Sequence, residues 1–204
     1  METRQELAAG AAQLGITPTG AQIENLCAYI ALLQKWNSAF NLVGTSNAQE
    51  LIQKHLLDSI AIGPFIKYSP VLDVGSGAGL PGIPLAITLP KLSFRLLDAN
   101  NKKVRFMRQA AIELNLSNIE IIHSRVEDYR PDQAPRSVIT RAFAPLDKAL
   151  NILSTVCADN GQVLLMLGER AQNSPAQTTY KDITTHAIRV PGLQSQRHLM
   201  VASK

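Results

Sequence analysis

Val71-Leu72-Asp73-Val74-Gly75-Ser76-Gly77-Ala78-Gly79-Leu80-Pro81-Gly82 decides the fold, because an apolar strand with one acidic residue runs directly into a glycine-dense turn. Glycine has no Cβ, so the backbone there can turn sharply and approach a ligand closely. The helix expected next offers unpaired N–H groups at its start. This order of strand, turn and helix predicts a site for a nucleotide-containing cofactor.

Two cofactor classes fit the glycine spacing. Gly77, Gly79 and Gly82 match G-x-G-x-x-G, which predicts a dinucleotide with its pyrophosphate at the helix N-terminus. Asp73 and Gly75 extend the run to acidic-x-G-x-G-x-G, which resembles the first motif of Rossmann-like methyltransferases. This pattern favours S-adenosylmethionine, with the loop under its methionine portion and carboxylates near its ammonium. A tight turn without a ligand is the third possibility.

Beyond this loop, short aliphatic runs alternate with helical segments. The strand-like runs are Val71–Val74, Phe94–Leu97, Ile119–Ile122, Ser137–Thr140 and Gln162–Leu167, and the helical segments are Pro81–Thr88, Lys102–Leu114 and Leu146–Cys157. Such alternation predicts a parallel sheet with crossover helices. Two further runs, Ile183–Val190 and His198–Ala202, flank Pro191-Gly192 and predict a β-hairpin. Residues 66–204 are thus predicted to form an α/β, Rossmann-like domain with a mostly parallel seven-stranded sheet and an antiparallel C-terminal hairpin.

Residues 1–65 are predicted to form a helical extension packed on this core. Apolar residues recur at helical spacing over Thr17–Trp36, where Thr17 and Pro18 provide a start signal, and over Asn47–Ile62, where Asn47 and Glu50 form a plausible capping pair. We expect Trp36 to pack these helices against the sheet.

His55 and Asp58 lie three residues apart on one face of the second helix, close enough to interact. Two roles stay open for them: a place in the active site, or a buried, hydrogen-bonded histidine between the N-terminal helices. The second is the preferred interpretation.

Composition limits the class of protein. The 204 residues carry a formal charge of +4, which permits a nucleic-acid partner through attraction to phosphates. No apolar run approaches the roughly 20 residues that span a bilayer, and Glu2 and Glu6 do not fit a signal sequence. We expect a soluble, cytoplasmic monomer without membrane contacts.

Cys27 and Cys157 lack metal-type spacing, so we expect two buried thiols, no metal and no disulfide.

Acidic residues follow two of the predicted strands. Asp98 ends the second strand, where a carboxylate can accept hydrogen bonds from ribose hydroxyls of either cofactor class, or cap the next helix. Val126 and Glu127 follow the third strand, where such folds contact adenine through a backbone amide and an acidic side chain. These three residues are predicted cofactor contacts, and a solvated loop charge is the alternative for Glu127 and for Asp128 beside it.

The end of the fourth strand is the predicted place of methyl transfer, because ligands bind beyond the carboxyl ends of parallel strands. There Arg141 can pair with a carboxylate or phosphate, and Phe143 can stack on a base; a structural arginine and a core phenylalanine are the alternative. The segment lacks both the Asp/Asn-Pro-Pro-Tyr/Phe of amino-group methyltransferases and a cysteine nucleophile. Guanine N7 needs neither, because its lone pair attacks without loss of a proton.

Lys102, Lys103 and Arg105, with Arg108, form a basic cluster on the helix after the second strand. Binding of RNA phosphates is the functional interpretation. A solvated helix face is equally compatible with the pattern.

Several segments together resemble the bacterial small-subunit ribosomal RNA guanine-N7 methyltransferases, once called glucose-inhibited division protein B. The matching segments are Lys35-Trp36-Asn37, Asn41-Leu42, His55-Leu56-Leu57-Asp58-Ser59, Asp73–Pro84, Lys103-Val104-Arg105-Phe106, Ser124-Arg125-Val126-Glu127, Arg141-Ala142-Phe143 and Arg197-His198-Leu199. They cover most of the chain and are far more specific than the glycine loop alone.

This resemblance implies a class I methyltransferase fold and methylation by S-adenosylmethionine of guanine N7 in the decoding-region loop of 16S ribosomal RNA. It implies cofactor contacts at Gly75, Leu80, Val126, Glu127 and Arg141. One position departs: Leu167 stands where the family often has a lysine, so a basic contact to RNA or cofactor is expected to be missing. A nicotinamide-dependent oxidoreductase and a noncatalytic RNA-binding module are the competing hypotheses.

Overall fold

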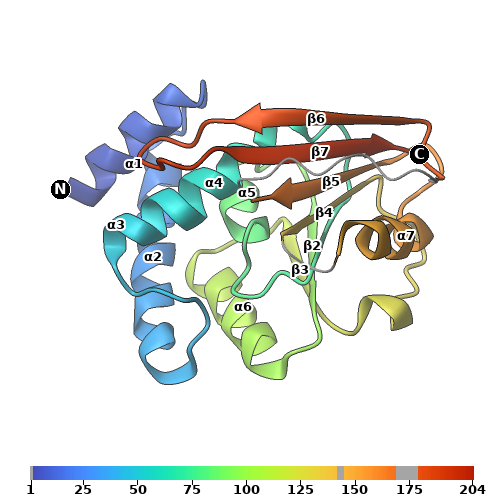
Figure 1. Cartoon of the computed structure of the whole chain (residues 1–204). Helices are drawn as coiled ribbons and strands as arrows, with labels where there is room; N and C mark the ends of the chain where they lie inside the picture. The colour runs from blue at the N-terminus through green and yellow to red at the C-terminus, as the bar shows by residue number, and fades with distance from the viewer. Residues whose placement is uncertain (1, 142–144, 169–178) are drawn as a thin grey trace.

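The computed structural model describes residues 2–141, 145–168 and 179–204. Its centre is a seven-stranded sheet with the strand order β3-β2-β1-β4-β5-β7-β6 (Figure 1). The strands are β1 (Val71–Val74), β2 (Phe94–Asp98), β3 (Ile119–His123), β4 (Ser137–Arg141), β5 (Gln162–Leu167), β6 (Asp182–Ile188) and β7 (Arg197–Ser203). The first five strands run parallel, and β7 is antiparallel to both β5 and β6. This confirms the predicted sheet and hairpin.

The helices form two layers, one on each face of the sheet (Figure 1). One layer contains α1 (Glu2–Gln13), α2 (Gly20–Phe40), α3 (Ala48–Leu51), the π-helical turn η1 (Ile52–Leu57), α4 (Asp58–Ile60), α5 (Gly82–Thr88) and α6 (Asn101–Glu113). The short helix η2 (Gly63–Phe65) leads into the sheet; η3 (Val126–Asp128) and α7 (Leu146–Val156) lie on the opposite side.

The central strands are mostly apolar because both of their faces are covered. All four residues of β1 are buried; Val71 joins the core beneath α2, α5 and α6, whereas Leu72 and Val74 join the core beneath α7. The strand order reverses between β1 and β4, so the chain leaves these neighbours in opposite directions. Such a switch point opens a crevice at the carboxyl ends of the strands, where ligands bind in folds of this kind.

The long helix α2 begins later than its sequence signal predicts. Thr19, not Thr17, is the N-cap: its side chain accepts a hydrogen bond from the Gln22 backbone N–H, and the Gln22 side chain accepts one from the Thr19 N–H. This reciprocal capping box satisfies two otherwise unpaired donors, so it outweighs the first-turn proline as a start signal. The same end is tied to α5 by the Gln22 amide, which donates to Ile87 O at 2.9 Å.

The second predicted helix is confirmed, but it is not a regular α-helix. Asn47 caps it by accepting from the Glu50 backbone N–H at 3.0 Å, as expected. Its middle, η1, is a π-helical turn, a feature frequently found at functional sites. The turn carries His55 and leads directly to Asp58.

Two further expectations are refined by packing. The Trp36 ring meets the Phe106 ring edge-on, with 5.6 Å between centroids, so this contact joins α2 to α6. Cys157 is buried as expected, whereas Cys27 is only half-buried. Within the described ranges, no helix is long and apolar enough to cross a membrane, and no cluster of three or more acidic, histidine or cysteine residues could hold a metal ion.

Candidate functional site

The turn after β1 has the backbone geometry that its glycines predict. Gly75, Gly77 and Gly79 have φ angles of 69°, 61° and 83°, in the left-handed region that residues with a Cβ rarely adopt. Backbone hydrogen bonds from Gly75 to Leu97 O and from Gly79 to Ser76 O, at 2.9 and 2.8 Å, fix the turn against β2 and against itself. The glycine run is therefore one rigid loop at the carboxyl ends of β1 and β2.

Asp73 supports this loop from below. Its side chain is fully buried, and Oδ2 accepts a hydrogen bond from the Gly82 N–H at 2.9 Å, where α5 begins. Among the described residues, its Oδ1 has no hydrogen-bond partner. Burial raises the pKa of this carboxyl to about 7, although the Gly82 hydrogen bond opposes the rise. Asp73 thus connects the strand to the helix across the loop.

Asp98 lies beside the loop at the end of β2. One of its oxygens accepts from the Gly77 N–H and the other from the Asn100 N–H, both at 2.8 Å. The N-cap of α6 is Asn100, so the interpretation of Asp98 as the helix cap is wrong. Each carboxylate oxygen can accept more than one hydrogen bond, so Asp98 keeps acceptor capacity toward a ligand.

A pocket of about 240 Å³ opens at the carboxyl ends of β1, β2 and β3. Its lining residues are Val74, Gly75, Leu97, Asp98, Ala99, Ser124, Arg125, Val126 and Glu127. Four predicted cofactor contacts, from three separate segments, therefore meet in one cavity. The other predicted contacts, Asp73, Gly77, Gly79, Leu80 and Arg141, are not part of its wall; Leu80 is buried in the core.

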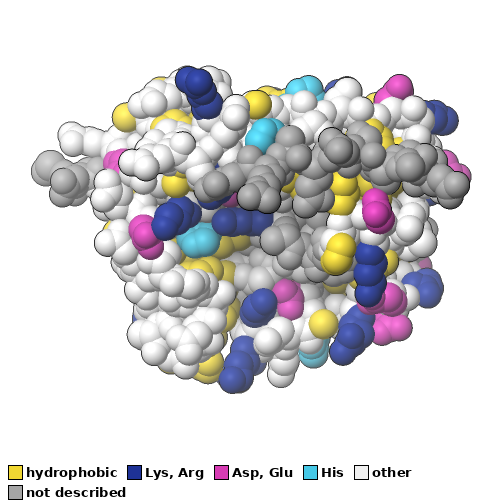
Figure 2. Space-filling view, in the orientation of Figure 1, with side chains coloured by type: hydrophobic (Ala, Val, Ile, Leu, Met, Phe, Trp, Pro, Cys, Tyr) yellow, Lys and Arg dark blue, Asp and Glu magenta, His cyan; other side chains and the backbone are white. Residues whose placement is uncertain are grey.

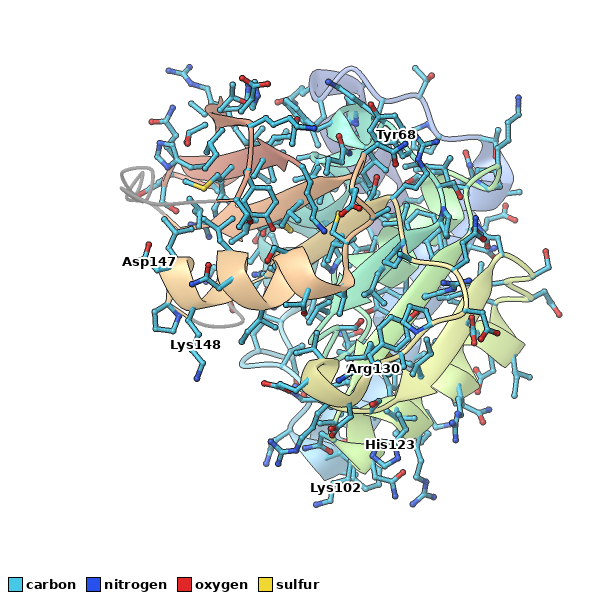
Figure 3. All side chains as sticks on the ribbon, turned by 90° about the vertical axis from the view of Figure 1, so that its right-hand side faces the viewer. Tyr68, Lys102, His123, Arg130, Asp147 and Lys148 are labelled. Atoms are coloured by element: carbon cyan, nitrogen blue, oxygen red, sulfur yellow. The ribbon has the colours of Figure 1, made fainter. Side chains whose placement is uncertain are left out.

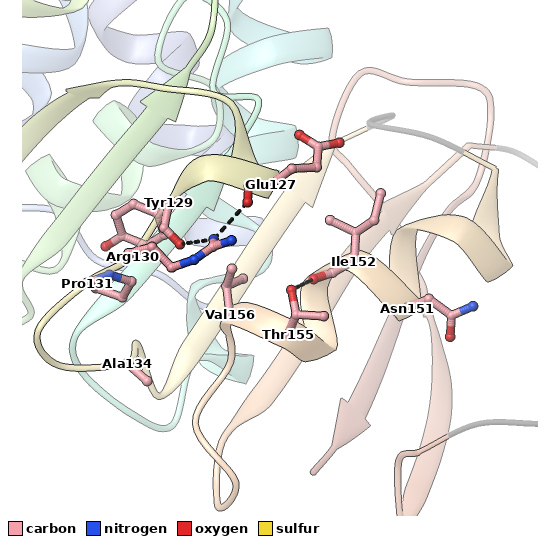
Figure 4. Close-up of a pocket in the computed structure, with 9 residues that line it drawn as sticks. All are labelled: Glu127, Tyr129, Arg130, Pro131, Ala134, Asn151, Ile152, Thr155 and Val156. Atoms are coloured by element: carbon pink, nitrogen blue, oxygen red, sulfur yellow. Dashed lines mark hydrogen bonds between the residues drawn. The ribbon is translucent and has the colours of Figure 1, made fainter.

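A second, larger cavity lies between η3 and α7, and it shares only Glu127 with the first (Figure 4). Its volume is about 640 Å³ and its wall is mostly apolar. Arg130 donates to the backbone oxygens of Glu127 and Tyr129, at 2.7 and 2.9 Å, and so holds the turn that carries Glu127 (Figure 4). This cavity contains no other predicted site residue.

Tyr29 of α2 is a loop-supporting residue that the sequence analysis does not identify. It is fully buried, and its hydroxyl donates to the Ala78 backbone oxygen in the glycine loop at 2.6 Å. A tyrosine within the apolar face of α2, three residues after Leu26, is the only sequence signal for this contact. The N-terminal helices thereby touch the candidate site directly.

Replacing Tyr29 by phenylalanine is expected to lower the free energy of unfolding by about 1–2 kcal/mol, because Ala78 O loses a buried hydrogen bond. Urea denaturation measures this loss. Tyr180→Phe is the matched control: its hydroxyl donates to Leu150 O at 3.1 Å in the other core. Both variants should lose stability, but only Tyr29→Phe should weaken binding of a ligand at the glycine loop. Equal ligand affinity in the two variants would contradict this role for Tyr29.

Arg141 points to the N-terminal segment. Its Nη1 donates to His55 Nδ1 at 3.1 Å and its Nη2 to Lys54 O at 3.0 Å. Because arginine only donates, His55 accepts through Nδ1 and carries its proton on Nε2. Burial and the neighbouring guanidinium lower the pKa of His55 to about 4, so its imidazole is neutral at pH 7. His55 is therefore hydrogen-bonded, as the preferred interpretation expects, but it is half-buried and its partner is Arg141 of β4.

Phe143, the other residue predicted to position the substrate, lies outside the described residues, as do its neighbours 142 and 144. Arg141 is the last described residue before them.

The basic residues of α6 lie at the same edge of the sheet. Lys102 and Arg105 are exposed and Lys103 is half-buried. Lys103 Nζ is 3.9 Å from the position that a Cβ on Gly77 would occupy, which places its ammonium beside the glycine loop. Figure 3 shows Lys102 near His123, where α6 begins and β3 ends. Lys103 therefore brings a positive charge beside the glycine loop.

The sequence matches a described family over most of its length. The family model for rRNA small subunit methyltransferase G (GidB) matches residues 22–200. The chain is 43% identical to the ribosomal RNA small subunit methyltransferase G of Pseudomonas syringae pv. syringae, covering 97% of this chain and 93% of that protein. It is 41% identical to the protein of the same name from Pseudomonas aeruginosa, covering 96% and 93%.

Solved structures of methyltransferases share the fold. Magnesium protoporphyrin IX methyltransferase from Synechocystis, solved with bound SAM, aligns with a TM-score of 0.59 at 15% identity, covering 86% of this chain and 97% of that one. TYW2 from M. jannaschii, solved with AdoMet, aligns with a TM-score of 0.57 at 16% identity, covering 74% and 75%. At these identities the likeness concerns the fold: a class I methyltransferase sheet with its helices.

Proposed function

The chain belongs to the rRNA small subunit methyltransferase G family, and on this basis we propose that it transfers a methyl group from S-adenosylmethionine to N7 of one guanine in the decoding-region loop of 16S ribosomal RNA. The observation that carries the proposal is the near full-length match to this family, supported by a pocket at the carboxyl ends of β1, β2 and β3. We further propose that the protein acts as a cytoplasmic monomer on the small subunit or its RNA.

The pocket residues suit the nucleoside portion of the cofactor. Asp98 has acceptor capacity for ribose hydroxyls, and Val126 and Glu127 offer a backbone amide and a carboxylate to adenine. The volume of about 240 Å³ is slightly below the roughly 300–1,000 Å³ of typical ligand sites. The methionine portion would then extend along Gly75, Gly77 and Gly79.

When bound, S-adenosylmethionine supplies an electrophilic methyl group on a sulfonium. Guanine N7 carries a lone pair at neutral pH, so no residue of this chain must remove a proton. The contribution of the protein is to hold both reactants in line, which by itself can supply much of the rate acceleration. In this proposal Arg141 and Phe143 position cofactor and base.

Phosphate contacts are assigned to Lys102, Lys103 and Arg105. The exposure of Lys102 and Arg105, and the position of Lys103 beside the glycine loop, support this assignment. Because such contacts release counterions, affinity for RNA should fall as salt concentration rises.

The test is methylation by the purified protein. Small ribosomal subunits that lack the modification, or their RNA, are incubated with S-adenosylmethionine, and the nucleosides are analysed by mass spectrometry. We expect 7-methylguanosine at one guanine. No product from either substrate would contradict the proposal; thermal stabilisation by NADH but not by S-adenosylhomocysteine would favour an oxidoreductase, and RNA binding without response to either cofactor a noncatalytic module.

Glu127→Gln should raise the KM for S-adenosylmethionine by about 10-fold or more, because a hydrogen bond to a charged group is worth about 1.5–3 kcal/mol. The measurement is initial rate against cofactor concentration at saturating RNA. Asp128→Asn is the matched control, since Asp128 is the next residue, is exposed and does not line the pocket. A change of the same size in both variants would contradict the adenine contact.

A further inference from the structure

Three segments far apart in the sequence meet around the Asp58 carboxylate. Its Oδ2 lies 3.6 Å from Arg141 Nη2, and its Oδ1 lies 3.7 Å from Arg197 Nε. The Asp58 side chain is 5% exposed, whereas those of the two arginines are 26% and 22% exposed. One buried carboxylate therefore stands between two guanidinium groups that still reach the surface.

Both arginines lie at the carboxyl edge of the parallel strands. Thr140 pairs with Val74, so Arg141 follows level with Gly75 at the start of the glycine loop. Strand β7 runs antiparallel to β5, and His198 pairs with Leu167, so Arg197 begins β7 where β5 ends. The two side chains thus come from β4 and β7, which lie on the same side of the switch point with β5 between them.

The cluster keeps a positive charge. Two guanidinium groups face one carboxylate, and His55, the third partner of Arg141, is neutral. Both carboxylate distances exceed the 2.7–2.9 Å of a charge-assisted hydrogen bond, so neither arginine is engaged in a bidentate pair. Arg141 is held also by Lys54 O, and Arg197 by Ser195 Oγ at 3.0 Å. Figure 2 shows basic and histidine side chains gathered over the α3 and α4 region.

We infer that Asp58 is a positioning residue that holds Arg141 and Arg197 side by side as a two-arginine clamp for an anionic oxygen group. The group is a carboxylate or phosphate: either the carboxylate of the cofactor or a backbone phosphate of the RNA. The inference rests on the proposed function for its substrate, but the arrangement of the three side chains stands without it. It gives the His55–Asp58 segment a role in the site through the arginines that it orients.

Asp58→Asn tests this role, because it removes the charge and keeps the size. We expect kcat/KM to fall by about 100-fold, as misplacement of a positioning group by about 1 Å can cost that much. The melting temperature should not fall in parallel, since a buried neutral amide avoids the cost of burying a charge. Glu120→Gln, which breaks the Arg95–Glu120 pair at the β3 edge, is the control and should keep wild-type activity. Unchanged kcat/KM in Asp58→Asn would overturn the inference, and so would a loss matched by unfolding.

A double-mutant cycle shows whether Asp58 acts through an arginine. Arg197→Gln and Asp58→Asn are combined, and we expect the double variant to be no worse than the more damaged single variant. If the fold-loss of kcat/KM in the double variant equals the product of the two single losses, the inference is overturned.

Binding measurements identify the anion and do not depend on catalysis. A weaker affinity of Asp58→Asn for S-adenosylhomocysteine without RNA assigns the clamp to the cofactor carboxylate; a weaker affinity for the RNA alone assigns it to a phosphate. Both results support the clamp, and wild-type affinity for both ligands overturns it. Because neither binding measurement requires methyl transfer, a failure of the clamp can be distinguished from a failure of the proposed methylation.

Discussion

Replacing Gly79 by alanine is expected to lower the free energy of unfolding by about 2–5 kcal/mol and to abolish cofactor binding. The φ angle of 83° is strained for alanine, at about 1–2 kcal/mol. A Cβ would also overlap the Ile83 side chain, with Cγ1 only 2.6 Å away, and overpacking costs about 1–3 kcal/mol. Urea denaturation and titration calorimetry with S-adenosylhomocysteine measure the two effects.

Gly77→Ala is the matched control for this prediction. Gly77 has a similar φ of 61°, but the nearest atoms to an added Cβ are 3.9 Å away, so only the backbone strain remains. We expect a loss of about 1–2 kcal/mol. If both variants lose the same stability, the contact with Ile83 does not constrain the loop.

The Asp73 carboxyl is expected to make the protein less stable as pH rises from about 4 to 7. Its pKa is raised from 3.8 to about 7 in the folded protein, so the folded state keeps a proton that the unfolded state has already lost. Its contribution is fully present below pH 3.8 and is lost as pH rises through 7. The free energy of unfolding changes by at most about 4 kcal/mol, because each unit of difference between the folded and unfolded pKa contributes about 1.36 kcal/mol.

Asp73→Asn isolates this effect. The free energy of unfolding is measured by urea denaturation at pH 4.5 and 7.5, and the difference between wild type and variant should grow at the higher pH in favour of the variant. The variant's free energy of unfolding must be subtracted from that of the wild type because His55 also titrates. Its pKa is lowered to about 4, so its contribution to stability rises between pH 4 and 6.5, opposite to that of Asp73. Asp128→Asn, at an exposed position, should follow the wild-type curve. Parallel curves for wild type and Asp73→Asn would show that this carboxyl does not titrate in that range.

Much of the sheet could be predicted because its central strands, such as β1 and β5, are buried on both faces. Mostly apolar runs such as Val71–Val74 and Gln162–Leu167 then mark strands within a residue or two of their true ends. The glycine loop was also predictable, since positive φ at Gly75, Gly77 and Gly79 is a local requirement of the backbone. Asp98 and Glu127 followed from the rule that parallel strands present their carboxyl ends at one edge.

Contacts between distant segments could not be predicted in the same way. The start of α2 differs from the prediction because the Gln22 side chain makes Thr19, and not Thr17, the cap. Tyr29 shows no local sign of its hydrogen bond to Ala78, a residue 49 positions away.

Local conformational preference and the burial pattern thus determine the alternation of strands and helices, the glycine loop and the residues at the strand ends. Each of these features depends on a few neighbouring positions in the sequence. The direction of the Arg141 side chain and its grouping with Asp58 and Arg197 depend on which surfaces pack together. A carboxylate as buried as that of Asp58 needs opposite charges nearby, and only the folded chain brings two guanidinium groups to it from β4 and β7. That requirement acts across space, so no stretch of sequence displays it.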